Sequence, residues 1–349
     1  MKFLAGIVAL ASMAAAAPNP RGGPTPLDVQ LEMAGNSAVK ATITNNGKNN
    51  LKVLKTGTIF DSSAVEKATV SANGQDLEFD GLRLHVATDN LKDEAFQHIP
   101  AGSSVEVTFD VAEVYDLSPG GAFDISTAGV LSFAEPDSNQ LVGSVSYSSN
   151  SIQAAVDGDE ASHARLAFHH KRTRVQSDCT GRKLQITQQA LRNCASLASA
   201  AQRAAASGPA SKVTEYFKNA ASSTRNTVAN VFSRVASECG STNSGVSRYY
   251  CSDVYGACNG QVLAYTLPSA SYMAYCDLYF DRLPALTRSC HAQDQATTNI
   301  HECTHLRQIK GTDDYGGYGY NFVRSLSAAQ NLNHADTYSL FANAIYVGC

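Results

Sequence analysis

The chain has 349 residues, enough for two ordinary domains, and its 27 basic and 31 acidic side chains give no sign of a nucleic-acid-binding surface. The charge is uneven: residues 18–172 have 11 basic and 20 acidic side chains, a net −9, whereas residues 173–349 have 15 and 11, a net +4. Opposite charges favour a first half that covers the second, as a pro-segment does, although two domains with unrelated surfaces would give the same totals.

The first seventeen residues have the pattern of a secretory signal peptide. Lys2 gives a positive start, Phe3–Ala11 is a short apolar run, and the small residues Ala14–Ala17 suit a cleavage site. The run is too short to span a membrane, and no other stretch reaches about 18 apolar residues. We therefore expect a secreted protein without a membrane anchor, with residues 1–17 removed. A buried N-terminal strand is the alternative.

Residues 18 to about 150 have the pattern of a β-rich domain. Short apolar runs with partial alternation are separated by turn signals such as Asn-Gly and Pro-Gly-Gly, which suggests a β-sandwich. The clearest run places Leu27, Val29, Leu31 and Met33 on one face. This part of the sequence shows no nucleophile, metal-binding cluster or phosphate loop. The expected strands are residues 27–33, 38–44, 51–54, 82–86, 105–111 and 130–133.

A dibasic pair, Lys171-Arg172, lies between the β-rich part and the first cysteine, where composition and cysteine usage both change. We expect a Lys-Arg-directed secretory protease to cut after Arg172, which would release residues 18–172 as a propeptide. An ordinary solvated charge pair is the alternative reading of these two residues.

Residues 173–349 have the pattern of a mainly helical α+β domain stabilised by disulfides. All nine cysteines of the chain lie in this half, after position 178. Their concentration indicates that this half alone has to survive an oxidising environment. Apolar spacing near 3.6 predicts helices, and a Tyr-rich stretch interrupted by Gly and Pro predicts a small twisted sheet. The helices are expected over residues 184–206, 211–239 (one or two) and 326–347, and the sheet over residues 248–281.

The most informative motif is His301-Glu302-Cys303-Thr304-His305. On a helix, residues i and i+4 share one face, so the two histidines can bind one cation. Zinc held there would polarise water and a substrate carbonyl, while Glu302 takes the proton and passes it to the leaving amine. Two solvent-facing histidines on an amphipathic helix are the alternative.

Catalytic zinc needs a third protein ligand. Gly311 stands where a third histidine of the longer form of this motif would lie, and no glutamate follows Glu302. The turn at residues 311–314 breaks the helix and returns the chain toward it, so an aspartate of this turn is the first choice. The candidates are Asp313, Asp314, His334 and Asp336.

At these residues the sequence resembles the deuterolysin family, the fungal neutral metalloendopeptidases of the aspzincin group. The family signature joins H-E-x-x-H to a G-T-x-D-x-x-Y-G stretch that supplies an aspartate ligand, and residues 311–319 read Gly-Thr-Asp-Asp-Tyr-Gly-Gly-Tyr-Gly. Residues 290–297 and 333–338 also look like deuterolysin segments. The resemblance covers the whole chain in layout and is densest from Cys251 to Cys349.

The resemblance implies one zinc per chain, with His301 and His305 as ligands, Glu302 as general base and Asp314 as third ligand. One extra residue in the glycine-rich stretch leaves Asp313 as an alternative. The match further implies that Asp336 supports the site, that Tyr279 matters for activity, and that Tyr318 stabilises the oxyanion; aromatic packing is the alternative for the two tyrosines.

The family pattern also implies the disulfides Cys179–Cys251, Cys258–Cys276 and Cys290–Cys349. Cys194 and Cys239 are left over from these pairs and would form a fourth disulfide. Cys303 lies about 200° from His301 around the helix, so we expect it unpaired and facing the core. The amino-terminal half has no cysteine, so latency would need steric cover or another ligand, for which His169 and His170 are candidates.

The resulting hypothesis is a secreted, monomeric zinc metalloendopeptidase with a zincin-like catalytic domain at residues 173–349. Its partners would be protein substrates, with a preference for basic ones implied by the family, its own propeptide before processing, and no nucleic acid or membrane. The alternative is a disulfide-rich secreted effector or binding protein with a non-catalytic metal site.

Overall fold

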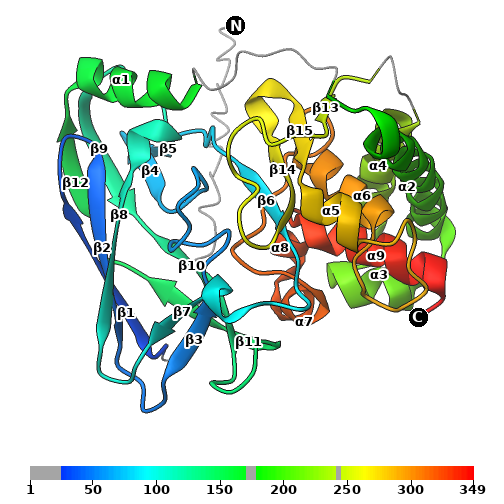
Figure 1. Ribbon diagram of the computed structural model, residues 1–349, viewed down its shortest axis with the longest axis horizontal. Helices are drawn as coiled ribbons and strands as arrows, with labels where there is room; N and C mark the ends of the chain where they lie inside the picture. Colours follow the sequence, from blue (N-terminus) through cyan, green and yellow to red (C-terminus); the bar gives the residue numbers. More distant parts are fainter. Residues whose placement is uncertain (1–24, 170–177, 241–244) are drawn as a thin grey trace, which may run out of the picture.

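The computed structural model describes residues 25–169, 178–240 and 245–349. The predicted signal peptide, His170 and the predicted cut after Arg172 lie outside these ranges. Figure 1 shows a β-rich amino-terminal half beside a mainly helical carboxy-terminal half, which confirms a mixed α and β architecture. Within the described ranges, no helix has the length and apolar character that a membrane crossing requires.

The amino-terminal half is built from short antiparallel strands around one apolar core. In β1 the side chains of Leu27, Val29 and Leu31 are buried and the residues between them are exposed, as the period of a half-buried strand requires. The sheets have the orders β1-β2-β8, β11-β10-β3-β7 and β12-β9-β4-β5. Helix α1 (Gly158–His169) was not expected from the sequence. The strands are β1 (Leu27–Met33), β2 (Ala38–Asn45), β3 (Leu51–Leu54), β4 (Thr69–Ala72), β5 (Gln75–Asp76), β7 (Phe96–Ile99), β8 (Ser104–Asp110), β9 (Gly121–Ser126), β10 (Ala128–Ala134), β11 (Leu141–Ser148) and β12 (Ile152–Val156).

The carboxy-terminal half packs its helices around α6 (Gln295–His305), all of whose residues are buried. Helices α2 and α9 and strand β14 all contact α6, and no face of α6 is exposed, so α6 lies in the centre of this half. The other helices are α2 (Gly181–Ser207), α3 (Ala210–Phe217), α4 (Ser222–Cys239), α5 (Asp277–Arg282), α7 (Tyr320–Ser325), α8 (Ala328–Asn331) and α9 (Ala335–Val347), and the strands are β13 (Arg248–Tyr250), β14 (Val262–Leu267) and β15 (Tyr272–Tyr275).

One strand of the amino-terminal half joins the sheet of the other half. Strand β6 (Arg83–Val86) pairs antiparallel with β14, which gives the sheet order β13-β15-β14-β6. In Figure 1 β6 runs beside β14, between the two halves. The sequence predicted a strand at residues 82–86 as one of those of the β-rich half, and the structure pairs this strand with a strand of the other half. The apolar side chains of Leu84 and Val86 pack in a core shared with Tyr265, so tertiary burial sets the partner of β6.

The cysteines pair within the carboxy-terminal half. Among the described residues the disulfides are Cys179–Cys251, Cys194–Cys239, Cys258–Cys276 and Cys290–Cys349. Three of these pairs were expected from the family pattern, and Cys194–Cys239 was expected because these two cysteines were left over. Cys303 is free and fully buried. The bridges tie α2 to α4 and fasten the carboxy terminus, so this half is cross-linked independently of the other.

The Cys194–Cys239 bridge, which joins residues 45 positions apart, is expected to stabilise the α2–α4 pair. Replacing both cysteines by alanine should lower the free energy of unfolding by about 2–4 kcal/mol, because the unfolded chain loses a cross-link. Urea unfolding followed by circular dichroism measures this. Cys303→Ala, which removes a thiol but no bridge, is the control. A double variant that unfolds at the parental urea concentration would contradict the prediction.

Candidate metal centre

The helix that contains the His-Glu-x-x-His motif is fixed at its first residue. Asp294 caps α6: its carboxylate accepts the Thr297 backbone N–H at 2.7 Å, and the Thr297 hydroxyl bonds back to the backbone of Asp294. The other Asp294 oxygen accepts the Thr287 N–H at 2.9 Å. This capping box gives hydrogen-bond partners to backbone N–H groups at the start of the helix, which have none within the helix, and it anchors the helix to the preceding loop. It therefore sets where the motif lies, two turns further on.

His301 and His305 point one ring nitrogen each at a common point. Their Nε2 atoms lie 3.1 Å apart, and both side chains are fully buried. The other nitrogens point outward: His301 Nδ1 donates to Asp336 Oδ1 at 3.0 Å, and His305 Nδ1 donates to the Thr312 carbonyl oxygen at 2.8 Å. A carbonyl oxygen only accepts, so His305 bears its proton on Nδ1, which leaves Nε2 with a lone pair.

The structure distinguishes the two aspartates of the turn after α6. The Asp314 carboxylate oxygens lie 3.3 Å from His301 Nε2 and 3.5 Å from His305 Nε2. The Asp313 carboxylate instead accepts from Arg83 Nη2 at 2.7 Å and from Asn333 Nδ2 at 2.9 Å. Asp314 is therefore brought to the histidine pair and Asp313 is not.

His334 and Asp336 form hydrogen bonds that fix the segments around His301, His305 and Asp314. Nε2 of His334 lies 3.0 Å from the Asp314 carbonyl oxygen and 3.1 Å from the Gly317 carbonyl oxygen. Oδ2 of Asp336 accepts the Gly319 backbone N–H at 2.6 Å, while its Oδ1 binds His301. His334 thus fixes the glycine-rich turn, and Asp336 joins that turn to His301.

Glu302 lies beside the histidine pair with one oxygen held and one available. The Thr266 hydroxyl of β14 donates to Oε2 at 2.6 Å. Oε1 is buried and has no hydrogen-bond partner among the described residues. Burial raises the pKa of Glu302 to about 8, which makes its carboxylate a stronger proton acceptor.

The charges of the site favour a bound cation. Burial lowers the pKa of His305 to about 3, so this ring is neutral at pH 7, as a metal ligand has to be. Burial also opposes a charge on His301, but the carboxylates of Asp314 and Asp336 outweigh it and raise the pKa of His301 to about 10. Burial would raise the pKa of Asp314, yet His305 and His301 lower it to about 2. Two buried carboxylates thus demand positive charge at this point.

The donor set fits a metal ion. His301, His305 and Asp314 each offer a ligand atom within 4.8 Å of the others, and all three are buried. Two imidazole nitrogens and one carboxylate oxygen match the three-ligand sites of catalytic zinc. The outward hydrogen bonds of both rings supply the orientation that such ligands require. The arrangement is that of a metal centre with a carboxylate, Glu302, at its side.

The two tyrosines singled out in the sequence lie in different places. The Tyr318 hydroxyl donates to the Leu84 carbonyl oxygen of β6 at 3.1 Å, next to the centre. Tyr279 is fully buried in the helical core, and its hydroxyl donates to the Gln295 carbonyl oxygen at 3.5 Å. Tyr318 therefore faces the strand that crosses the site, whereas Tyr279 packs against the start of α6.

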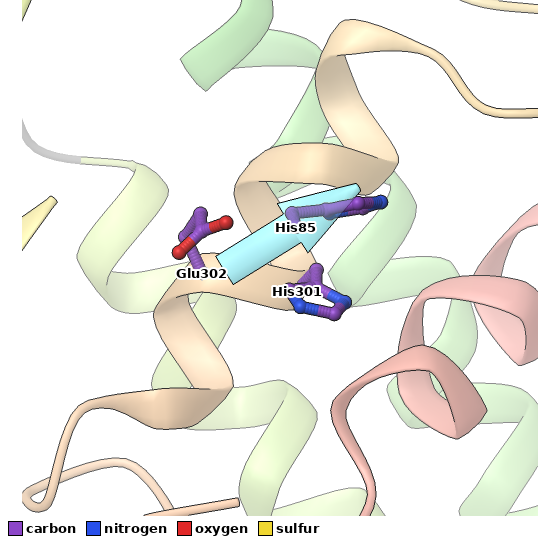
Figure 2. Close-up of side chains that lie close together, drawn as sticks. All are labelled: His85, His301 and Glu302. Carbon is purple, nitrogen blue, oxygen red and sulfur yellow. The ribbon is translucent and has the colours of Figure 1, made fainter. Parts of the chain in front are cut away.

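Sequence reasoning missed one residue at the centre, His85 of β6. Its ring centroid lies 3.9 Å from that of His301, and a His85 nitrogen lies within 4.8 Å of ligand atoms of both His301 and Glu302. Figure 2 shows His85 on its strand beside these two side chains of α6. A single histidine in a short strand gives no local signal, because its neighbours come from the pairing of β6 with β14.

Comparison with known proteins shows the family to which the chain belongs. Residues 1–349 match the Deuterolysin metalloprotease (M35) family. A neutral protease 2 homolog from Colletotrichum graminicola is 55% identical over 351 residues, and one from Phaeosphaeria nodorum is 53% identical over 356, each covering 100% of both chains. A solved zinc peptidase from Grifola frondosa aligns with 48% of this chain and 97% of its own at 19% identity, with a TM-score of 0.39.

The family match extends over the whole chain. The chain therefore belongs to the deuterolysin metalloprotease family and is a metalloendopeptidase.

Proposed function

We propose that the protein is a secreted zinc endopeptidase that hydrolyses internal peptide bonds of proteins, with one zinc per chain. His301, His305 and Asp314 are the proposed ligands. The observation that supports them most is the convergence of two Nε2 atoms 3.1 Å apart on the Asp314 carboxylate. Two nitrogen donors and one oxygen donor suit zinc, which leaves its fourth position for the reaction. The family resemblance adds a preference for basic proteins.

In this proposal Glu302 is the general base and then the general acid. Zinc, when bound, supplies Lewis acidity toward water and the substrate carbonyl. Because the Thr266 hydroxyl holds Oε2, Glu302 presents Oε1 to the attacking water, takes its proton and returns it to the leaving amine.

Three further residues support the reaction. Asp336 keeps the Nδ1 proton of His301 in place and so aims its Nε2. The Tyr318 hydroxyl already donates to a peptide carbonyl oxygen, that of Leu84, so it is suited to stabilise the oxyanion. Tyr279, bonded to the first residue of α6, is proposed to act through the position of that helix.

The proposed layout of the chain is a signal peptide at residues 1–17, a propeptide at residues 18–172 and a catalytic domain at residues 173–349. Two observations support it. The disulfides found in the described chain all lie in the last segment. The metal centre, too, draws its three proposed ligands and Glu302 from that segment alone. Secretion would allow the bridges to form and to persist.

Glu302→Gln tests the mechanism directly. Glutamine keeps the shape of the side chain but does not accept a proton, so casein hydrolysis by the processed enzyme should fall by about 10²–10⁴-fold. Zinc content, measured by atomic absorption, should stay near that of the parent because Glu302 is not a ligand. Proteolysis that persists in a zinc-containing variant would refute the role of Glu302.

Asp314→Asn and Asp313→Asn form a matched pair of variants in the processed enzyme. Removing the charge of Asp314 should weaken zinc binding by at least about tenfold, since this carboxylate faces both histidine Nε2 atoms. Asp313→Asn should leave zinc binding within about twofold of the parent, because its carboxylate accepts from Asn333 and does not face the histidine pair. Competition with a chromogenic chelator gives both affinities. The reverse order would make Asp313 the ligand.

The layout is tested by sequencing the amino terminus of the secreted protein. Cleavage after Arg172 should give a mature chain that begins at Thr173. A variant with Lys171→Ala and Arg172→Ala should be secreted uncleaved, with correspondingly larger mass. A mature chain that begins elsewhere, or processing that is unchanged in this variant, would refute the proposed site.

A further inference from the structure

Strand β6 lies directly over the proposed catalytic centre. It belongs to the amino-terminal half, yet its register with β14 places Arg83 opposite Thr266 and His85 opposite Ala264. Thr266 is the residue whose hydroxyl holds Glu302. The strand therefore brings its own backbone and side chains to the place where the general base has to work.

Polar contacts on both sides of His85 hold β6 in this position. The Leu84 carbonyl oxygen accepts from the Tyr318 hydroxyl, and the Arg83 guanidinium pairs with Asp313. On the other side, the Val86 carbonyl oxygen accepts from the Gln293 amide at 2.9 Å, and the Ala87 N–H donates to the Gln261 carbonyl oxygen at 2.8 Å. Each of these partners lies in residues 173–349, so the contacts fasten one half of the chain to the other.

Gln293 also fixes the orientation and the proton of the His85 ring. Its Oε1 accepts the Thr88 N–H at 3.1 Å, so its amide nitrogen is the group that faces His85 Nε2 at 2.8 Å. His85 Nε2 is then an acceptor, and the neutral ring bears its proton on Nδ1. That Nδ1 is buried and has no partner within the described part of the chain, as is also true of Glu302 Oε1.

Two partnerless polar atoms thus belong to neighbouring side chains of the centre. A donor, His85 Nδ1, and an acceptor, Glu302 Oε1, are both buried, and the two residues lie together with His301 (Figure 2). His85 is missing from the group formed by His301, His305 and Asp314. The ring therefore lies on the side of the centre where Glu302, the proposed general base, lies.

We propose that His85 occupies the place of the attacking water in the uncleaved chain and thereby keeps the enzyme latent until β6 is released. This inference rests on the proposed function, since it needs residues 18–172 to be a removable propeptide. It identifies the inhibitory histidine as His85. The His169 side chain and the whole of His170, the two sequence-based candidates, lie outside the described part of the structure.

The test uses the full-length chain with Lys171→Ala and Arg172→Ala, so that it stays uncleaved, and with Co(II) in place of zinc. Acetohydroxamate is the small metal-binding probe, and its binding is followed by the visible absorption of Co(II). If His85 leaves the site free in less than about a tenth of the molecules, the site binds acetohydroxamate at least about tenfold more weakly than a site that is always free. His85→Ala should therefore bind the probe at least about tenfold more tightly than the uncleaved parent.

His98→Ala is the matched control, because His98 is an exposed histidine of the same half, on β7. It should bind acetohydroxamate as the uncleaved parent does. His85→Ser, which is small and polar, repeats the measurement if the alanine variant is not secreted. Equal probe affinity in the parent and in either His85 variant would overturn the proposal and would leave steric cover by β6 as the cause of latency.

A second arm separates this inference from the proposed function. In the cleavable chain, processing followed by removal of residues 18–172 should give equal casein hydrolysis for the parent and for His85→Ala, because His85 leaves with the propeptide. If neither processed protein hydrolyses casein, the proposed function fails. If both do, and the uncleaved parent hydrolyses casein at the same rate as the processed one, latency itself is refuted.

Discussion

The structure depends on the burial of a histidine pair whose four ring nitrogens all need partners. His301 and His305 are fully enclosed, and a buried imidazole nitrogen without a partner is costly. Two of the nitrogens are satisfied by Asp336 and by the Thr312 carbonyl oxygen. The other two face each other and Asp314 across a space that suits a cation. The centre is therefore completed only when positive charge lies between these side chains.

Much of the carboxy-terminal half can be understood as support for that pair. Asp336 lies in the first turn of α9, and Thr312 and Asp314 lie in the turn after α6, so two segments that follow α6 must return to it. The backbone bridge between Asp313 and His334 joins those segments. The Cys290–Cys349 bridge fastens the end of α9 near the loop that precedes α6. A small displacement of these elements would therefore change the orientation of the His301 and His305 rings.

The sequence predicted the features that depend on local pattern. Residues 27–33 and 51–54 were expected as strands with the bounds that β1 and β3 have, because alternation and turn signals are local. The region of α2 was likewise recognised from its 3.6-residue spacing. Strands such as β9 and β12, with weak apolar patterns, were missed since their stability comes from their neighbours. The family resemblance favoured Asp314 but left Asp313 open, and the fold separates the two, because adjacent residues of one turn point in different directions.

The position of His85 at the centre is the other feature that local sequence pattern could not predict. It lies about 216 positions before His301 in the sequence, and the pairing of β6 with β14 alone brings the two together. A cysteine at this place could exchange with the eight cysteines of the other half that form four disulfides. An imidazole offers a nitrogen beside the metal site without taking part in disulfide exchange. The pairing of β6 with β14 thus places an imidazole, and no thiol, beside Glu302 and His301.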